Sequence, residues 1–371
     1  MSVPFIQLGA VNNAVLEEFC EDLKQLFESS HYIHGPAVQR FEEQFARYCG
    51  SRFGIGVNSG TDALLLSMAA MDVGPGDEVI CPAFTYGRCG DVVARLGATP
   101  IFADVRADSY CLDPDLAMAS IGSRTKAIVA VHLFGQACEI DRLVTIARTY
   151  SVSILEDMRH ATGARLGNRR LGSFGRFGCF SFYPTRPLGG IGDGGMITTH
   201  EEAAAEKLRQ LRDHGRSATD GSHVLIGYNS RLDALQAMLL QRKLQELDEN
   251  NLERVENARL YTRLFKESPV TTPVFRDDLS HVYNMYTVLA PDREKLIEHL
   301  NAKGIGHKVY YPAPLHLHPA FRYLDYKEGA FPVSEDLARR AISLPIAPGL
   351  KKHHIEEVAS TVLEFYGVTT G

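Results

Sequence analysis

Apolar positions recur every three or four residues between 13 and 29, which predicts an amphipathic helix, and the same spacing predicts a second helix over 37–48. A short apolar strand over 53–57 leads through a polar turn into a buried helix that begins near residue 63. Further apolar runs alternate with helical stretches as far as residue 155. Apolar strands separated by helices are typical of a parallel sheet covered on both faces. The strands expected there are 78–81, 100–104, 127–131 and 152–155, and the helices are 86–96, 113–121 and 141–150.

The second half of the chain begins with helical patterns and ends in an alternation of strands and helices. At 371 residues the chain is longer than one core usually supports. We therefore expect a large α/β domain over 1–250 and a smaller α/β domain over 251–371. The helices expected are 201–213, 231–247 with a charged continuation to about 268, 292–303, 334–342 and 353–366, and the strands are 283–290 and 308–311.

Composition narrows the functional classes without naming one. Hydrophobic residues make up 45%, charged residues 23%, and the formal net charge is −6, so nothing favours nucleic acid or an anionic membrane as a partner. The seven cysteines are scattered without a Cys-x-x-Cys pair, which favours neither disulfides nor zinc. The cysteine pattern therefore gives no reason to expect a metal. With no signal segment and no apolar run of about 20 residues, we expect a cytoplasmic protein.

Ligands of parallel sheets bind beyond the carboxyl ends of the strands. The turn at 58–62 sets the backbone N–H groups of Gly60, Thr61 and Asp62 at a helix start, which suits a phosphate but is equally a plain helix cap. Asp157 follows another strand, where a carboxylate either caps the next segment or keeps a cofactor ring nitrogen protonated. Tyr86 follows a third strand and is either a core aromatic or a ring-stacking one.

The stretch 179–195 joins an apolar strand, a Pro-Thr-Arg-Pro turn and a glycine-rich segment. Such a turn presents one side chain, here Arg186, at the mouth of a pocket. With the other strand ends, the chain resembles over nearly its whole length the family of fold type I pyridoxal-phosphate enzymes named after DegT, DnrJ, EryC1 and StrS, the sugar aminotransferases. The resemblance rests on Asn58-Ser-Gly-Thr-Asp-Ala-Leu64, Pro82-Ala-Phe-Thr-Tyr86, Val131-His-Leu-Phe-Gly-Gln136, Glu156-Asp157 with Gly163-Ala164, Phe180-Ser-Phe-Tyr-Pro-Thr185, Gly192-Asp-Gly-Gly195 and Gly227-Tyr-Asn-Ser-Arg-Leu232.

The resemblance implies an α/β fold with a mainly parallel sheet, a smaller C-terminal domain and a homodimer whose two chains share each active site. It also implies a nucleotide-linked keto sugar as substrate and a pyridoxal or pyridoxamine phosphate cofactor. Its phosphate would be held by Gly60, Thr61, Asp62 and Ser181 and by Asn229 of the partner chain, and its ring by Tyr86 and Asp157.

The chain also departs from the family's pattern. Arg186 stands where the family has its Schiff-base lysine, and a guanidinium cannot supply the neutral primary amine that an imine needs. His160 stands where Gln is usual, Arg159 where Ala is usual, Thr162 where His is common, and Arg88 where a small residue or Thr is usual. Three guanidiniums in one pocket repel unless an anion or carboxylates neutralise them. Arg88 and Arg159 therefore either bind substrate or form structural ion pairs.

Two further residues belong to the predicted site through the family's small domain. Lys308 is expected to contact substrate, although it is a poor candidate to replace the missing lysine. His316 belongs to a His-Leu-His loop without a carboxylate or cysteine cluster, so we expect it at the substrate entrance and not on a metal.

Three interpretations remain open at this stage. In the first, the protein holds the cofactor noncovalently and acts on a keto sugar or related metabolite, with His160 as the base. In the second, the cofactor has been lost, and Arg88, Arg159 and Arg186 bind an anionic substrate directly in an enzyme or binding protein. In the third, a lysine at position 186 was exchanged deliberately, which the accompanying changes at 88, 159 and 160 disfavour.

Overall fold

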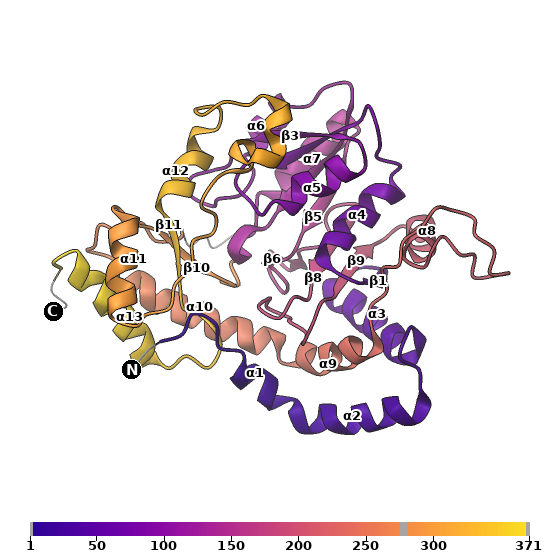
Figure 1. Ribbon diagram of the computed structural model, residues 1–371, viewed down its shortest axis with the longest axis horizontal. Helices are drawn as coiled ribbons and strands as arrows, with labels where there is room; N and C mark the ends of the chain where they lie inside the picture. Colours follow the sequence, from indigo (N-terminus) through magenta and orange to yellow (C-terminus); the bar gives the residue numbers. More distant parts are fainter. Residues whose placement is uncertain (1–2, 275–279, 369–371) are drawn as a thin grey trace.

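The computed structural model describes residues 3–274 and 280–368, and its large part is built around a seven-stranded sheet (Figure 1). The strand order is β1-β9-β8-β5-β4-β2-β3. Apart from the first one or two residues of some strands, the strands are almost wholly buried. This burial explains why the sequence shows continuous apolar runs there. The strands are β1 (Phe53–Val57), β2 (Glu78–Pro82), β3 (Thr99–Ala103), β4 (Thr125–Val131), β5 (Ser153–Asp157), β8 (Phe177–Ser181) and β9 (Gly195–Thr199).

The sheet is mixed, whereas the apolar runs alone predict a parallel one. β9 is antiparallel to both of its neighbours, β1 and β8, while β8, β5, β4, β2 and β3 are parallel to one another. β9 follows the glycine-rich turn directly, and a turn without a crossover helix returns the chain antiparallel to the strand that it leaves. No strand is predicted over 195–199 from the apolar runs. Because β9 is antiparallel and the other neighbouring pairs are parallel, the mainly parallel sheet implied by the family resemblance is the correct description.

Helices cover the sheet close to where the sequence predicts them. The first predicted helix is two helices, α1 and α2, joined at Val15, and the helix expected over 231–247 begins only after Asp233. The helices of this part are α1 (Gly9–Ala14), α2 (Leu16–Ser29), α3 (Gly35–Cys49), α4 (Gly60–Ala70), α5 (Arg88–Arg95), α6 (Pro114–Ala119), α7 (Ile140–Tyr150), α8 (Glu202–Arg212) and α9 (Ala234–Gln245).

A second, smaller group of elements packs around the antiparallel pair β10 (Tyr286–Leu289) and β11 (Ala341–Leu344). Its buried residues form their own apolar cluster, and the long helix α10 (Leu247–Leu264) contributes to it from Ala258 onward. Since α10 runs across the predicted boundary at 250, the exact division into domains stays a prediction. The remaining helices of this group are α11 (Arg293–Ala302), α12 (Pro332–Arg340) and α13 (Lys352–Phe365).

Two predictions for this second group are wrong. The strand expected over 308–311 is reduced to one isolated bridge between Lys308 and Ser343. The helix expected over 334–342 ends at Arg340, and the chain continues at once as β11. The apolar residues 341–344 are buried opposite β10, so tertiary pairing overrides the helical spacing.

The segment between α8 and α9 extends away from the rest of the protomer (Figure 1). Ile226 on this segment is 95% exposed and Val224 is 52% exposed. Exposed apolar side chains on a projecting segment are typical of a surface that another chain covers. Among the described helices, none combines the length and apolar character needed to cross a membrane.

Candidate active site at the end of β5

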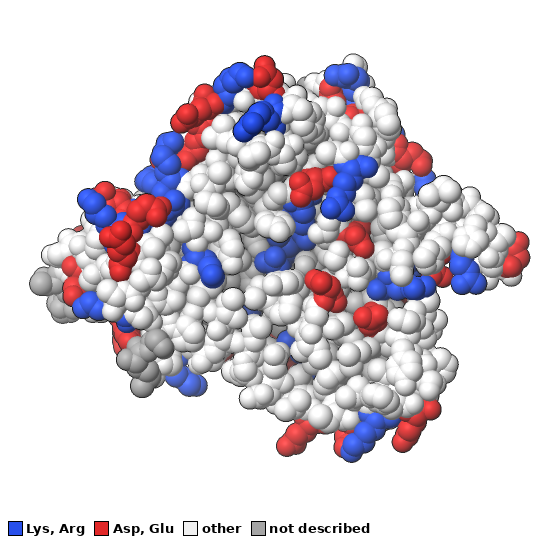
Figure 2. Space-filling model, viewed as in Figure 1, with Lys and Arg blue, Asp and Glu red and all other residues white. Residues whose placement is uncertain are grey.

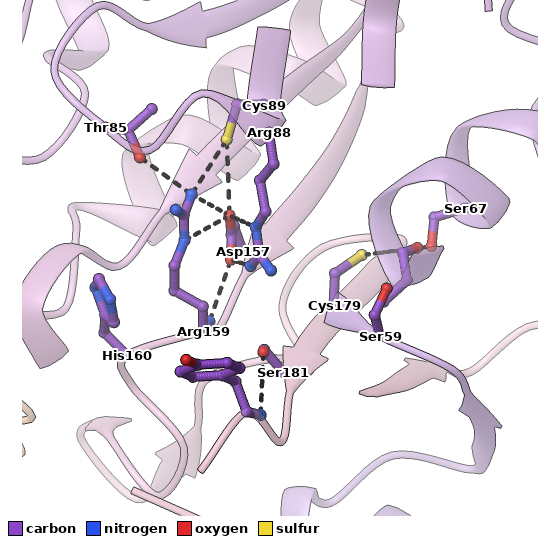
Figure 3. A network of polar contacts seen from close by, with 12 residues as sticks. Ser59, Ser67, Thr85, Arg88, Cys89, Asp157, Arg159, His160, Cys179 and Ser181 are labelled. Carbon is purple, nitrogen blue, oxygen red and sulfur yellow. Dashed lines mark hydrogen bonds and ion pairs between the residues drawn. The ribbon is translucent and has the colours of Figure 1, made fainter. Parts of the chain in front are cut away.

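The predicted site is organised around Asp157, the last residue of β5. Its side chain is fully buried in the middle of the sheet, between β4 and β8. Arg88, the first residue of α5, donates from Nη2 to Asp157 Oδ1 at 2.5 Å. Arg159, two residues after Asp157, donates from Nη2 and Nε to Asp157 Oδ2 at 2.7 and 3.1 Å. Figure 3 shows the carboxylate between the two guanidinium groups. We name Arg88, Asp157 and Arg159 the Asp157 cluster.

Further contacts fix Arg159, whose side chain is also fully buried. Its backbone N–H donates to Asp157 Oδ1 at 3.1 Å, and its Nη2 donates to Thr85 Oγ1 at 3.1 Å. Its guanidinium lies 5.6 Å from the centre of the Tyr86 ring, within the range of a cation–π contact. Cys89 adds a weak contact from Sγ to Asp157 Oδ2 at 3.6 Å. Arg159 therefore lies between the Asp157 carboxylate and the Tyr86 ring.

Charge pairing determines the ionisation of Asp157. Burial alone would raise the pKa of the carboxyl, but the charges and hydrogen bonds of Arg159 and Arg88 outweigh burial and hold the pKa well below its usual range. The same carboxylate raises the pKa of Arg159 against the effect of burial. Both residues stay charged at neutral pH, and Arg88 and Arg159 are the structural ion pairs that the sequence left as one of two alternatives.

Arg186 contrasts with these two arginines. It lies in the turn after β8, where its backbone N–H donates to Tyr183 O, and its guanidinium is 5.8 Å from the Tyr183 ring. Its Nε is buried without a hydrogen-bond partner, and no carboxylate among the described residues forms an ion pair with it. Burial, with the charges of Arg88 and Arg159, lowers the pKa of Arg186 to about 10. The site thus holds three guanidiniums for one carboxylate.

The turn before α4 lies against the Asp157 cluster. Ser59 Oγ accepts the N–H of Asp62, and Asp62 Oδ2 accepts the hydroxyl of Ser230. A Cβ added to Gly60 would lie 2.5 Å from Arg88 Nη1 and 2.5 Å from the Ser181 Cβ, so this close approach requires glycine. Gly60, Thr61, Asp62 and Ser181 are therefore gathered at one helix start, as predicted from the family, but the Arg88 guanidinium lies against that start.

His160 is fully buried beside the cluster. Its Nδ1 accepts the backbone N–H of Phe134 at 3.1 Å, and its ring stacks on the Phe134 ring. Its Nε2 has no partner. Burial, followed by the charges of Arg186 and Arg159, lowers the pKa of His160 well below its usual value. The imidazole is therefore neutral at pH 7, with Nδ1 as an acceptor, which makes it a weak base.

Of the remaining predicted residues, Tyr86 lies at the mouth of the site, and Asn229, Lys308 and His316 lie elsewhere in the chain. Asn229 is exposed at the base of the projecting segment, opposite Asp213 in an isolated bridge. Lys308 is exposed, and only its backbone is paired. His316 is buried, and its Nε2 lies 3.0 Å from Oε1 of Glu335 on α12. Tyr86 is 55% exposed at the mouth of the site.

Two contributors to the cluster received no role from the sequence. Thr85 and Cys89 both contact Arg159, and both flank residues that the sequence did single out. Their positions beside Tyr86 and Arg88 were the only signal available. Within residues 3–274 and 280–368, no group of three or more His, Cys, Asp or Glu is placed to hold a metal ion.

The fold is that of the fold type I pyridoxal-phosphate aminotransferases. An aminotransferase from Streptomyces venezuelae, DesV, solved in complex with a ketimine intermediate, superimposes with a TM-score of 0.96 at 38% identity, covering 100% of both chains. The chain belongs to the DegT/DnrJ/EryC1/StrS aminotransferase family, whose model matches residues 13–363.

Two relatives span almost the whole chain. It is 40% identical to a pleiotropic regulatory protein of Geobacillus stearothermophilus, over 99% of each chain. It is 38% identical to the dTDP-3-amino-3,4,6-trideoxy-alpha-D-glucose transaminase of Streptomyces venezuelae, over 98% of this chain and 96% of the relative. The second of these relatives and a further one from Aneurinibacillus thermoaerophilus are named as sugar transaminases. Pyridoxal or pyridoxamine phosphate is the cofactor typical of the family.

The contacts of Asp157 do not fit that cofactor. A pyridinium nitrogen needs a free carboxylate oxygen, but both oxygens of Asp157 already accept guanidinium donors. Arg159 lies between Asp157 and the Tyr86 ring, and Arg88 lies against Gly60, where ring and phosphate are expected. The residues expected to hold the cofactor phosphate lie at the start of α4, whereas arginine side chains lie where the ring is expected.

Proposed function

We propose that this chain is a divergent member of its family that binds an anionic, nucleotide-linked sugar or a related metabolite through Arg186 and does not catalyse ordinary transamination. The observation that carries the proposal is the occupancy of both Asp157 oxygens by Arg88 and Arg159, combined with an Arg186 that has no carboxylate partner. Its relatives that act on dTDP-linked and UDP-linked sugars supply the substrate class.

The chemistry of Arg186 supports this proposal. By the resemblance it stands in place of the lysine that forms the imine and moves the proton in transamination. A guanidinium is protonated at neutral pH and cannot do either step. It does bind phosphate and carboxylate groups well, because its fork of donors matches two oxygens at once. The same substitution that removes transamination therefore adds an anion-binding group.

A second candidate is noncovalent binding of pyridoxal or pyridoxamine phosphate, with His160 as the base. The helix start of α4 with Ser181 favours it, because backbone N–H groups at a helix start suit a phosphate. The occupied Asp157 and the lowered pKa of His160 count against it.

Cofactor retention separates the two candidates. Purified protein is incubated with pyridoxal phosphate or pyridoxamine phosphate, desalted, and scanned for retained cofactor absorbance. We expect none, together with calorimetric binding of a dTDP-sugar that Arg186→Met weakens about tenfold. Retained absorbance in the wild-type protein would contradict the proposal and favour the second candidate. Arg186→Lys is the matched variant: an aldimine band there but not in the wild type would show that only the nucleophile is missing.

We also propose a homodimer in which the projecting segment before α9 contacts the partner. Support comes from Ile226 and Val224, which are largely exposed there, and from Asn229 at the segment's base. Ile226→Glu should shift the protein toward the monomer in light scattering, whereas exposed Leu252→Glu on α10 should not. A monomeric wild type would rule this proposal out.

A further inference from the structure

On the other side of the Arg186 turn lies a cavity of about 60 Å³. Its walls come from the N-terminal segment, the turn itself, α9, α10 and the start of the smaller group of elements. None of the residues that line it is Asp or Glu. Its polar lining consists chiefly of Gln7, Arg186, Lys243, Arg254 and Asn284. We name this the basic cavity.

Among the described residues, no carboxylate forms an ion pair with the three cations of the basic cavity. Lys243 on α9 is 5% exposed, and its ammonium donates to Gly189 O at 2.5 Å and to Asn12 Oδ1 at 2.9 Å, which leaves one of its three donors. Arg254 on α10 is 6% exposed and donates to Asn251 Oδ1 at 2.9 Å and, more weakly, to Asn250 O. Across the described chain, neither forms an ion pair with a carboxylate. Buried cations without a negative partner are unfavourable.

Unused hydrogen-bond acceptors lie in the same walls. Gln7 Oε1, Asn284 Oδ1 and Arg186 Nε are buried and have no hydrogen-bond partner within the part of the chain that the structure describes. The amide nitrogen of Asn284 is already used, donating to Thr185 O at 3.0 Å, which fixes its oxygen as the free end. Buried polar atoms in a folded protein are nearly all paired, so several orphans in one cavity need an explanation.

A ligand that satisfies both sets of atoms has a definite chemistry. The cations would bind phosphate or carboxylate oxygens, and the two amide oxygens would accept hydrogen bonds from O–H donors. A single water needs roughly 10–15 Å³ of such a cavity, so this one has room for an anionic group and a hydroxyl or two. We propose that the basic cavity binds the anionic end of a small hydroxylated anion, the phosphate of a sugar phosphate or the carboxylate of a sugar acid, through Lys243, Arg254 and Arg186, with Gln7 and Asn284 accepting its nearest hydroxyls.

This site goes beyond the proposed function, because of its polar lining only Arg186 also faces the Asp157 cluster. Burial and the nearby charge of Arg254 lower the pKa of Lys243 to about 8, and a bound anion would reverse that destabilisation of the charged amine. The prediction of an anion site at Lys243 does not depend on whether a cofactor binds at the Asp157 cluster.

Calorimetry with defined probes tests the site. Glucose 6-phosphate, glucuronate, inorganic phosphate and uncharged glucose are each titrated into the wild-type protein at neutral pH. We expect glucose 6-phosphate or glucuronate to bind, the difference between them identifying the anion, and glucose not to bind. Lys243→Met and Arg254→Met should each weaken binding roughly 10- to 100-fold. Gln7→Leu should weaken the sugar about tenfold and leave inorganic phosphate unchanged.

Arg263→Met is the matched control, because Arg263 is exposed on the same helix as Arg254. Should Arg254→Met fail to fold in circular dichroism, Lys243→Met and Gln7→Leu carry the test. Absence of binding by both charged sugars, or equal losses in Arg263→Met, would overturn the inference. Cofactor retention by the wild type would contradict the proposed function and leave this inference standing. In that case Lys243→Met should still weaken sugar binding and should leave the cofactor absorbance unchanged.

Discussion

Two groups of buried cations lie on either side of Arg186, and they differ in whether a carboxylate pairs with them. In the Asp157 cluster, Arg88 and Arg159 share one fully buried carboxylate, with N···O distances of 2.5 and 2.7 Å. In the basic cavity, Lys243 and Arg254 have only amide and carbonyl partners. The positive charge of the first group is neutralised partly by Asp157 of the same chain. The charge of the second group is neutralised, by our proposal, when an anion binds.

This difference shows that one fold can hold a group of buried cations that is paired internally beside a group that is not. Arg88 and Arg159 supply positive charge next to Asp157, so the buried carboxylate is paired within the chain. Arg186 adds a further positive charge that Asp157 does not contact. The Lys and Arg atoms grouped near the centre of the face in Figure 2 show that a local basic region coexists with a net charge of −6.

The largest effect that we predict follows from removing the shared carboxylate. Asp157→Asn keeps the shape of the side chain but leaves Arg88 and Arg159 without a counter-charge in a buried site. Breaking a buried ion pair from one side typically costs 3–5 kcal/mol, so we expect the free energy of unfolding to fall by about that amount. Urea denaturation followed by circular dichroism measures it.

Glu202→Gln is the control for this measurement. It removes the partner of Arg52 in an ion pair whose two side chains are 60% and 71% exposed. Exposed pairs contribute about 0–1 kcal/mol, so this change should be nearly neutral. Similar losses in the two variants would mean that the Asp157 cluster is not energetically distinct from the surface.

A smaller effect is expected from His160 as the pH falls. Its folded pKa lies well below the unfolded value of about 6.5, so the unfolded chain binds more protons below that pH and stability declines. If the folded imidazole stays neutral, the loss between pH 7 and pH 5 is about 2 kcal/mol. His160→Gln should remove that part of the loss, as seen by urea denaturation at both pH values.

Exposed His353 provides the comparison for this second prediction. His353→Gln should leave the difference between pH 7 and pH 5 unchanged. An unchanged difference in His160→Gln as well would indicate that His160 accepts a proton readily beside three guanidiniums. That result would make His160 a candidate base again. It would also contradict the conclusion that burial and the nearby guanidiniums keep the His160 imidazole neutral.

The sequence predicted the fold better than the contacts within the candidate site, and the roles of the site residues stay predictions. Strand β1 matches the expected range, and Asp157 lies at the end of its strand as expected, because both depend on local apolar runs. β9 was missed since its run follows glycines without helical spacing, and β11 was missed because pairing with β10 is a tertiary effect. Whether Arg159 turns toward Asp157 or toward solvent depends on Thr85 and Cys89, which spacing does not reveal.

The basic cavity was beyond prediction for a similar reason. Its polar residues come from positions 7, 186, 243, 254 and 284, which no local pattern connects. Lys243 and Arg254 occur in helical stretches where a charged residue usually faces solvent. Only the packing of α9 and α10 against the N-terminal segment buries them together.

The smallest effect, and the one that tests the comparison most directly, is expected for Arg186→Met. The variant keeps an unbranched side chain but removes a buried charge that has no carboxylate partner, so without ligand we expect a free energy of unfolding that is unchanged or about 1 kcal/mol higher. Urea denaturation should place it opposite in sign to Arg88→Met, which breaks an ion pair. Saturating glucose 6-phosphate should stabilise the wild type by about 2.7 kcal/mol at 100 times its dissociation constant, and the variant by less at the same concentration. A loss above about 2 kcal/mol in the ligand-free variant would make Arg186 a structural partner of the Asp157 cluster, and the distinction between the two groups of cations would then fail.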